Sequence, residues 1–333
     1  MKHTKMGKAN VEVSRICLGT MHFGPKTDKK DAFRIMDKAL DMGINFFDTA
    51  NIYGRDKGPG ATEEIVGEWF EKSGKRNEVV LATKVYHSMT GKQEPNEAMG
   101  ISRYKIRRHL EDSLRRLKTD RIELYQVHHI DRRITPEEFW DSFEFHRQRG
   151  EITYVGTSNF PGWGLEKYDL AAEQRGSLGI VSEQCQYNLL SRYPELEVIP
   201  AALDRRIGIM PYMPLGGGTL SGKSQPEAGS RTEEVEKEYK LNSVGSYDPL
   251  QQFRQLCGDL GQKPAVVAIA WVLSNPAVYS GIVGVRTEAH LEGLDAASEL
   301  ELDESTLQRL NEIFPYTVNR PLAQGPAPEA FAW

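Results

Sequence analysis

Strand-like and helix-like segments alternate eight times along this 333-residue chain, and that alternation restricts the fold more than any other feature. Eight short runs rich in Val, Ile, Leu, Phe and Tyr are expected to form strands buried on both faces. These runs are residues 16–20, 45–50, 79–84, 122–128, 152–158, 180–187, 207–213 and 281–285, and segments with helical spacing between them include 31–42, 62–73, 102–118, 135–150, 165–176 and 195–206. Eight such units favour an α/β fold, a closed parallel (β/α)8 TIM barrel formed as one domain over residues 1–333, rather than an open doubly wound sheet.

The two ends of the chain and one long connection lie outside this alternation. Residues 4–6 and 11–13 flank a turn, which predicts an N-terminal β-hairpin that plugs one end of the barrel. Residues 321–333 lack periodicity but end in two aromatic residues, which predicts a packed C-terminal tail over the barrel mouth. The connection after the seventh predicted strand runs from Pro214 to about Asp248, and loops of that length are usually functional or mobile.

Four chemically active side chains lie near the carboxyl ends of three successive predicted strands. Asp48 and Tyr53 come at the end of the second strand and in the loop after it, Lys84 ends the third strand and His128 ends the fourth. In a barrel these strand ends share one mouth, where active sites form. A tyrosine has an ordinary pKa of about 10, and a nearby ammonium group stabilises the phenolate and moves the pKa toward neutrality. Such a site protonates an oxygen as negative charge develops on it, which carbonyl reduction requires when another group delivers the hydride.

Each of these residues has a simpler role when taken singly. A tyrosine after a strand often packs at the rim, and a lysine at a strand end is usually a solvated charge. His129 competes with His128, but the two-residue period of a strand places them on opposite sides, so that only one faces the mouth. The spacing from Tyr53 to Lys57 imitates the Y-x-x-x-K pair of short-chain dehydrogenases, yet the glycines and the proline around it exclude the helix that pair needs.

The contexts FFDTANIYG, LATK and LYQVHH around these four residues resemble the catalytic tetrad of the aldo-keto reductase superfamily. Further motifs of that family follow in order as LGT, VGTSNF, QCQYNL, PLG, SGK and GVRT, so the resemblance covers nearly the whole chain. It implies a (β/α)8 barrel that binds NADP(H) across its mouth without a Rossmann domain. It also implies that Tyr53 is the general acid, that Lys84 and Asp48 tune it, and that His128 orients the carbonyl group.

The same resemblance implies a set of cofactor-binding residues. Ser158, Asn159 and Gln184 would hydrogen-bond the nicotinamide amide, and Tyr212 would stack on the ring. The glycine-rich start of the loop after strand seven would let backbone amides approach the pyrophosphate, with Lys223 adding positive charge. The complete expected set is Gly19, Thr20, Asp48, Ser158, Asn159, Gln184, Tyr212, Met213, Pro214, Leu215, Gly216, Ser221, Lys223, Arg231, Gly284, Arg286 and His290.

The preference between NADP(H) and NAD(H) depends on the adenosine end of this set. Arg286 and Arg231 favour NADP(H), because a guanidinium group pairs well with a 2'-phosphate, although either arginine also fits an ordinary surface charge. His290 and the pair Gly293 and Leu294 stand where many members of the family carry a Gln and a Glu-Asn pair for adenosine. The strength of the NADP preference is therefore left open.

The net charge and the cysteine content limit the kinds of binding partner and the cellular compartment that we expect. With 42 Lys and Arg against 47 Asp and Glu, the net charge of -5 argues against nucleic acid or an anionic membrane and favours a small-molecule carbonyl substrate. The three cysteines are far apart, which predicts no disulfide framework and fits a reducing cytoplasm. The first residues lack an apolar signal core, no run approaches the roughly 20 apolar residues that cross a bilayer, and a cytoplasmic location is expected. The scattered histidines show no ligand spacing, so no metal is expected either.

Two alternatives accompany a general NADP(H)-dependent reductase of aldehydes and ketones. The strand-four ending HHID and the terminal GPAPEAFAW resemble a bacterial branch of the family that includes keto or enoyl reductases of nucleotide-linked deoxyhexoses. Potassium-channel beta subunits also resemble the family and keep its cofactor site, so a cofactor-binding regulatory subunit is the alternative from another class. Residues 217–224 match the pattern G-x-x-x-x-G-K-[ST], but Pro226 and Gly229 exclude the helix that must follow a phosphate-binding loop.

Overall fold

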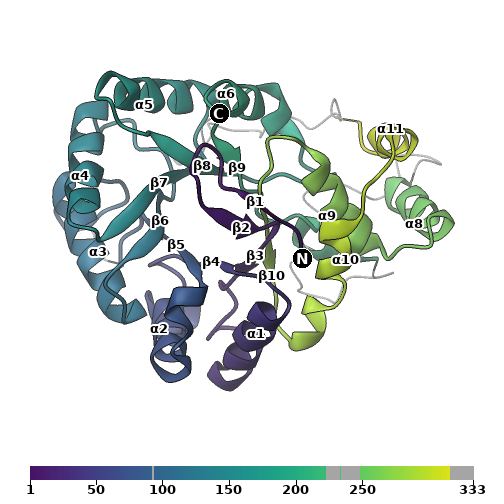
Figure 1. Ribbon diagram of the computed structural model, residues 1–333, viewed down its shortest axis with the longest axis horizontal. Helices are drawn as coiled ribbons and strands as arrows, with labels where there is room; N and C mark the ends of the chain where they lie inside the picture. The colour runs from purple at the N-terminus through teal and green to yellow at the C-terminus, as the bar shows by residue number, and fades with distance from the viewer. Residues whose placement is uncertain (92–93, 223–232, 234–247, 316–333) are drawn as a thin grey trace.

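Eight parallel strands form one sheet in the computed structural model, which describes residues 1–91, 94–222, 233 and 248–315. The strand order is β10-β3-β4-β5-β6-β7-β8-β9, and the strands ring a centre surrounded by helices (Figure 1). The strands are β3 (Ile16–Gly19), β4 (Phe46–Asp48), β5 (Val80–Val85), β6 (Ile122–Val127), β7 (Ile152–Ser158), β8 (Ile180–Gln184), β9 (Gly208–Ile209) and β10 (Gly281–Gly284). The predicted (β/α)8 barrel is confirmed.

The ring closes between β9 and β10 through single backbone hydrogen bonds. Ile209 N donates to Ala277 O at 2.8 Å, Tyr279 N donates to Ile209 O at 3.1 Å, and Ile282 N donates to Pro211 O at 2.9 Å. The predicted seventh strand, 207–213, shrinks to two residues because Pro211 lacks an amide hydrogen and interrupts the ladder. The backbone stays beside β8, since Tyr212 N still donates to Cys185 O at 2.9 Å.

Helices cover the outside of the barrel, and side-chain caps fix where several of them begin. Asp28, Ser102, Thr135, Asp248 and Asp303 each accept a backbone amide of the following first turn, a contact worth about 1 kcal/mol. The helices are α1 (Lys29–Asp41), α2 (Ala61–Ser73), α3 (Arg103–Leu117), α4 (Pro136–Gln148), α5 (Gly162–Gln174), α6 (Val198–Asp204), α8 (Pro249–Asp259), α9 (Pro264–Ser274), α10 (Leu294–Glu299) and α11 (Glu304–Ile313). Short 3-10 helices are η1 (Arg55–Lys57), η2 (Lys75–Glu78), η3 (Tyr193–Leu196), η4 (Gly216–Ser221) and η5 (Glu288–Leu291).

The predicted helix over 195–206 is split into η3 and α6. Glu197, between them, has φ -143° and ψ -50°, which no helix accommodates. Its side chain instead accepts a hydrogen bond from Trp163 N, at the start of α5, at 2.9 Å. A side chain that caps a neighbouring helix has therefore interrupted its own helix.

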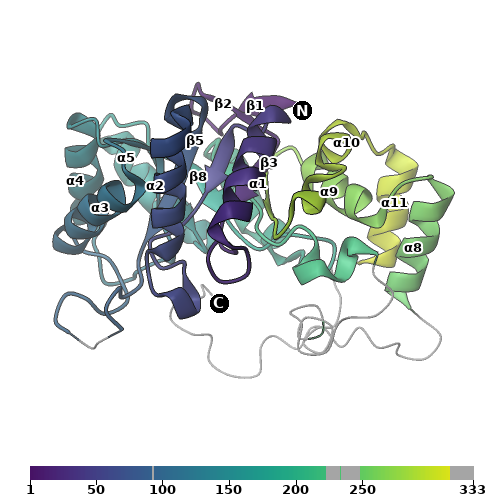
Figure 2. The same cartoon turned by 90° about the horizontal axis from the view of Figure 1, so that it is seen from below.

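The N-terminal hairpin closes one end of the barrel, as the sequence predicts. β1 (His3–Lys5) and β2 (Glu12–Ser14) pair antiparallel, and Figure 2 shows them across the upper end of the barrel. Met6 and Val13 are fully buried in one apolar cluster with Phe46, Val181 and other inward-facing strand residues. Gly7 has φ +54°, and a Cβ there would lie 2.2 Å from Val181 O, so the hairpin turn needs glycine to approach the barrel this closely.

Two expectations concern residues outside the described part of the chain. They are the tail over residues 321–333 and most of the long connection from Pro214 to Asp248. Within the described ranges, no single helix has the length and apolarity to cross a membrane; only α8 and α9 taken together meet that test, and they are bent by 94°.

Candidate active site

Asp48, Lys84 and His128 come from the carboxyl ends of three adjacent strands. Asp48 is the last residue of β4, Lys84 is the last but one of β5, and His128 directly follows β6. The register places Ala82 of β5 beside Asp48, and Gln126 of β6 beside Lys84. Tyr53 lies in the loop between β4 and α2. The position that the sequence predicts for all four residues, at one end of the barrel, is the one that the structure gives.

The Lys84 ammonium group joins a carboxylate to the tyrosine hydroxyl. Lys84 Nζ lies 2.6 Å from Asp48 Oδ2, 2.9 Å from Thr49 O and 3.3 Å from Tyr53 Oη. Lys84 is 0% exposed, so the three contacts hold the charge without help from water. Burial alone lowers the pKa of Lys84, but the charges and hydrogen bonds of Asp48 and Tyr53 outweigh it and leave the pKa above its ordinary value. Lys84 is therefore charged at neutral pH.

The second oxygen of Asp48 is held by two amide side chains. Gln126 Nε2 donates to Asp48 Oδ1 at 3.1 Å, and Gln184 Nε2 donates to the same oxygen at 3.0 Å. These two bonds hold Oδ1, while Lys84 holds Oδ2. Gln126 is absent from the sequence-based set of site residues, although it lies two positions before His128 and the strand period could have placed it on the inner face.

His128 lies beside Tyr53, with the two rings edge to face at 79° and their centroids 5.9 Å apart. Burial first, and then the positive charges of Lys84, His129 and His87, lower the pKa of His128 well below its ordinary value. The imidazole is therefore neutral at pH 7 and has one N–H group to donate. Its Nδ1 atom is buried and has no hydrogen-bond partner among the described residues.

The expectation that His128 and His129 lie on opposite sides of the strand is wrong. Their rings are parallel within 6° with centroids 5.2 Å apart, and His87 lies against both. β6 ends at Val127, so both histidines belong to the following loop, where the two-residue period of a strand no longer applies. Three imidazoles consequently gather at the mouth, although the sequence spacing suggested only one.

The residues expected to hold an amide group of the cofactor are connected to each other. Asn159 has φ +55°, a conformation that asparagine tolerates, and its Nδ2 donates to His128 O at 3.1 Å and to Ser158 Oγ at 3.0 Å. Tyr212 Oη donates to Asn159 Oδ1 at 3.0 Å. Ser158 lies opposite Gln184 in the register of β7 and β8. The structure thus brings these four predicted residues together beside the tetrad.

Gly19 and Thr20 support the tetrad from β3. Gly19 lies opposite Asp48 in the sheet register and opposite Gly284 of β10 on its other side. Both the amide and the hydroxyl of Thr20 donate to Asp48 O, at 3.0 and 2.9 Å. These bonds fix the backbone where the chain leaves β4.

The loop after β9 is rich in glycine, as backbone phosphate sites are, although the amides of Gly216 and Gly218 donate to Met213 O and Leu215 O at 2.9 and 3.0 Å. Gly216, Gly217 and Gly218 have φ of +55°, +69° and +108°, and three successive residues in this region suit glycine alone. Met213, at φ +58°, begins the loop, and Pro214 and Leu215 lead into these glycines. The hydroxyl of Thr219 is buried without a hydrogen-bond partner in the part of the chain that the structure describes. Ser221 Oγ donates to Gly218 O at 2.6 Å, while Lys223 and Arg231 lie outside the described residues.

Arg286 and His290 lie together beyond β10. Arg286 is exposed, its carbonyl accepts from Thr27 Oγ1 at 3.0 Å, and its amide donates to His290 Nδ1 at 3.2 Å. Gly293 has φ +82° and precedes α10, and Leu294 is only 5% exposed. Leu294 thus serves the core, whereas the Arg286 side chain is available to a ligand at the mouth.

The model of the aldo/keto reductase family matches residues 15–314, which include the four tetrad residues and all eight barrel strands. The chain belongs to this family. Over 340 residues it is 49% identical to the uncharacterized oxidoreductase YrpG of Bacillus subtilis (strain 168), covering 100% of each chain. It is 32% identical over 337 residues to the aldo-keto reductase YhdN of the same organism, covering 97% of this chain and 96% of that one. It is also 29% identical over 339 residues to protein tas of Escherichia coli (strain K12), covering 94% and 97%.

One further residue positions this aldo/keto reductase site and was not foreseen. Glu183 of β8 is fully buried, and its Oε1 accepts from Phe160 N at 3.0 Å while its Oε2 contacts Thr157 Oγ1. Burial raises the pKa of Glu183 to about 8, although the hydrogen bonds from Thr157, Phe160 and Asn159 lower it. A largely neutral carboxyl group therefore holds the turn that carries Asn159.

Proposed function

We propose that this oxidoreductase reduces an aldehyde or ketone with NADP(H), and that Tyr53 donates the proton. The observation that carries the proposal is the buried Lys84 ammonium group, 2.6 Å from Asp48 and 3.3 Å from the Tyr53 hydroxyl. A buried cation beside a phenol stabilises the phenolate that remains after proton transfer, and the interaction is stronger in a low dielectric than in water. Asp48 keeps the lysine charged and in place.

His128 binds the same substrate oxygen from the other side. A neutral imidazole donates one hydrogen bond to the carbonyl oxygen without competing with Tyr53 as an acid, because protonated histidine would be the stronger acid of the two. The hydrogen bond from Asn159 to His128 O holds the backbone at this position. Tyr53 and His128 together place the oxygen, and the proton moves from Tyr53 Oη to it as its negative charge develops.

The residues at the mouth fit a nicotinamide dinucleotide. NADPH supplies the hydride when it is bound. Ser158, Asn159 and Gln184 present amide and hydroxyl groups that match a carboxamide, and Tyr212 offers an aromatic face beside them. The glycines at 216–218 have no side chain to keep a pyrophosphate away from the backbone, and the same loop carries the Thr219 hydroxyl, which has no partner among the described residues. The exposed Arg286 guanidinium suits a 2'-phosphate and favours NADP(H) over NAD(H).

A substrate panel tests this function. NADPH absorbance would be followed with simple aldehydes, aryl ketones and nucleotide-linked 4-keto sugars, each against a reaction without substrate. We expect turnover well above background with at least one class of carbonyl compound. Turnover of the nucleotide-linked 4-keto sugars would show whether the chain acts as a reductase of nucleotide-linked deoxyhexoses. Tight NADPH binding with background turnover in every arm would contradict the proposal and favour a cofactor-binding regulatory subunit.

Arg286→Ala tests the cofactor preference separately. Losing a bidentate contact with a phosphate should raise the KM for NADPH by about 10- to 100-fold and leave the KM for NADH within about twofold. Steady-state kinetics with both cofactors measure the difference. Arg309→Ala, which removes an exposed arginine paired with Glu312 on α11, is the matched control. An equal loss with both cofactors would contradict the assignment.

A further inference from the structure

Three histidines outside any predicted metal motif gather at the barrel mouth. His87 follows β5, and His128 and His129 follow β6. The His87 ring is nearly perpendicular to both others, at 83° and 86°, with centroids 5.0 and 5.3 Å away. One ring nitrogen of each histidine lies within 4.8 Å of the ring nitrogens of the other two. The cluster therefore has three potential metal ligands from two adjacent loops.

We propose that His87, His128 and His129 bind one divalent transition-metal ion of the zinc type, and that the bound ion blocks carbonyl reduction. Three imidazoles with a fourth position open to water are a recurrent donor set for Zn²⁺, and imidazole also suits Cu²⁺ and Ni²⁺. His128 belongs both to this cluster and to the proposed catalytic site. An ion held by the three histidines would fix the His128 ring toward His87 and His129, so that it could no longer turn its N–H group to the substrate oxygen.

The unpartnered nitrogen of His128 is an independent observation that points to a ligand. Its Nδ1 is buried and has no partner in the described residues, whereas most buried polar side-chain atoms are hydrogen-bonded. A buried nitrogen without a hydrogen-bond partner destabilises the fold. Coordination of an ion through Nδ1 would give this nitrogen the partner it lacks, and the hydrogen would then lie on Nε2.

The charges around the cluster permit a cation despite the nearby lysines. The positive charge of Lys84 acts on His128, but Asp48 pairs with this lysine at 2.6 Å. Lys105 acts on His87 from α3 and is held by the carbonyl groups of Tyr86 and Ala98 at 2.6 and 2.7 Å.

The cluster needs only side-chain movement to close around an ion. Zinc–nitrogen distances near 2.0–2.1 Å in a tetrahedron correspond to about 3.4 Å between ligand nitrogens. The nitrogens lie within 4.8 Å of one another, so they must approach by at most about 1.4 Å. Rotation about the side-chain torsions supplies a shift of that size without moving the strands.

Metal binding is tested on tag-free, metal-free protein without reference to turnover. Co²⁺ is added at pH 7.5, its visible absorption reports tetrahedral coordination, and Zn²⁺ titration calorimetry gives affinity and stoichiometry. We expect one ion per chain and at least about a tenfold loss of affinity in His87→Gln and in His129→Gln separately. His3→Gln removes an exposed histidine at the opposite end of the barrel and should leave the affinity unchanged. Unchanged affinity in both cluster variants, or an equal loss in His3→Gln, would overturn the site.

The blocking effect is a second measurement on the same variants. Saturating Zn²⁺ should reduce NADPH-dependent turnover at least tenfold in the unmodified chain, and the half-inhibiting concentration should rise at least tenfold in His87→Gln. Each variant is compared with its own rate in the presence of a chelator. Binding without inhibition would overturn the blocking effect. Because the Co²⁺ titration requires no turnover, failure of the proposed reductase function leaves the metal site testable.

Discussion

An ion pair lies at each end of β5: Lys84 pairs with Asp48 of β4 at the carboxyl end, and Arg76 of η2 pairs with Glu123 of β6 at the amino end. At the carboxyl ends, Lys84 and Asp48 are 0% and 3% exposed in their side chains, and the third contact of Lys84 is a tyrosine hydroxyl. At the amino ends, Arg76 and Glu123 are 12% and 16% exposed. Only the first pair leads to a group that can transfer a proton.

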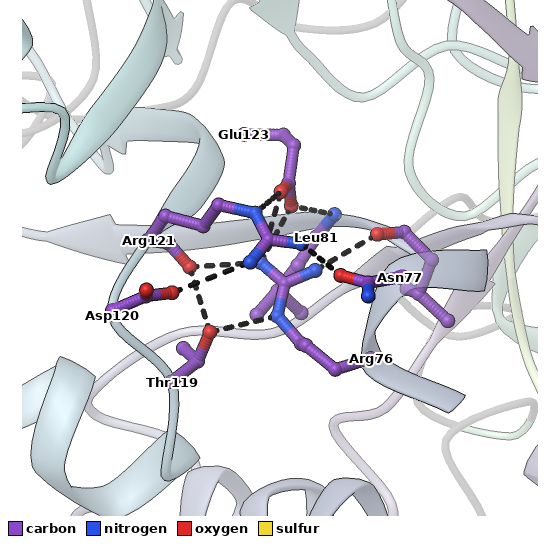
Figure 3. A network of polar contacts seen from close by, with 8 residues as sticks. Arg76, Asn77, Leu81, Thr119, Asp120, Arg121 and Glu123 are labelled. Atoms are coloured by element: carbon purple, nitrogen blue, oxygen red, sulfur yellow. Dashed lines mark hydrogen bonds and ion pairs between the residues drawn. The ribbon is translucent and has the colours of Figure 1, made fainter. Parts of the chain in front are cut away.

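At the amino end of β5, Arg76 and Glu123 are hydrogen-bonded to neighbouring backbone and side-chain groups, as Figure 3 shows. Arg76 donates to both oxygens of Glu123 at 3.0 and 2.8 Å, and also to Thr119 Oγ1, Val79 O and Arg121 O. Glu123 Oε2 also accepts from Leu81 N at 2.9 Å. The contacts of Arg76 with Thr119, Arg121 and Glu123 tie the turn before β5 to β6 and to the turn before it. In a (β/α)8 barrel the amino-terminal face is expected to supply stability and the carboxyl-terminal face chemistry, and these two pairs show the contrast at the two ends of β5.

Lys84→Met should have the largest effect, because it affects chemistry and stability together. Removing one partner of a buried pair leaves Asp48 uncompensated and costs about 3–5 kcal/mol of unfolding free energy. Without the ammonium group, kcat should fall by about 10²- to 10⁴-fold. Denaturant unfolding and NADPH-coupled turnover measure the two effects. Lys8→Met removes the lysine that pairs with Asp169 at 2.7 Å near the hairpin, and this matched variant should lose stability but keep its kcat.

Arg76→Met should affect stability only. It removes the hydrogen bonds to Glu123, Thr119 and two carbonyl groups, which should lower the unfolding free energy by about 2–3 kcal/mol. We expect kcat to stay within about twofold, because the site is at the other end of the strands. A fall in kcat as large as that of Lys84→Met, measured under conditions where the variant is folded, would remove the distinction between the two ends.

Glu183→Gln should appear in the pH dependence of stability. The pKa of Glu183 is raised to about 8 in the fold, above the value of about 4.3 expected when unfolded. The folded chain therefore binds more protons than the unfolded chain between these values, and Glu183 loses its stabilising effect as the pH rises toward 8. Unfolding free energies measured from pH 5 to pH 9 should decline less steeply in the glutamine variant. Parallel profiles would show that the carboxyl group does not titrate as described.

The barrel and the grouping of the four residues at its mouth could be predicted from the sequence for specific physical reasons. Runs of apolar residues identify strands buried on both faces, and the ends of parallel strands in a closed barrel meet at one mouth, so Asp48, Lys84 and His128 could be placed together. Gln126 followed the same strand period and could have been found. The single-domain assignment and the cytoplasmic location remain predictions.

Features that depend on the backbone conformation of a loop or on the burial of a side chain could not be predicted from the sequence. The His128 and His129 rings stack on each other because β6 ends at Val127. The sequence alone does not show at which residue the hydrogen bonds between two strands end. β9 is short because Pro211 interrupts it in a place where the apolar run continues. The role of Glu183 depends on its full burial between two strands, which a carboxylate in a sequence does not suggest.

The most direct test of the account is a single-turnover measurement on Tyr53→Phe. Enzyme in excess and saturated with NADPH is mixed with a carbonyl substrate from the panel, and the loss of NADPH absorbance is followed by stopped flow. Because phenylalanine keeps the ring beside Lys84 and His128 but lacks the proton, the rate should fall by about 10³-fold while the Kd for NADPH changes less than about threefold. A rate within about tenfold of the unmodified chain would contradict the assignment of Tyr53 as the proton donor.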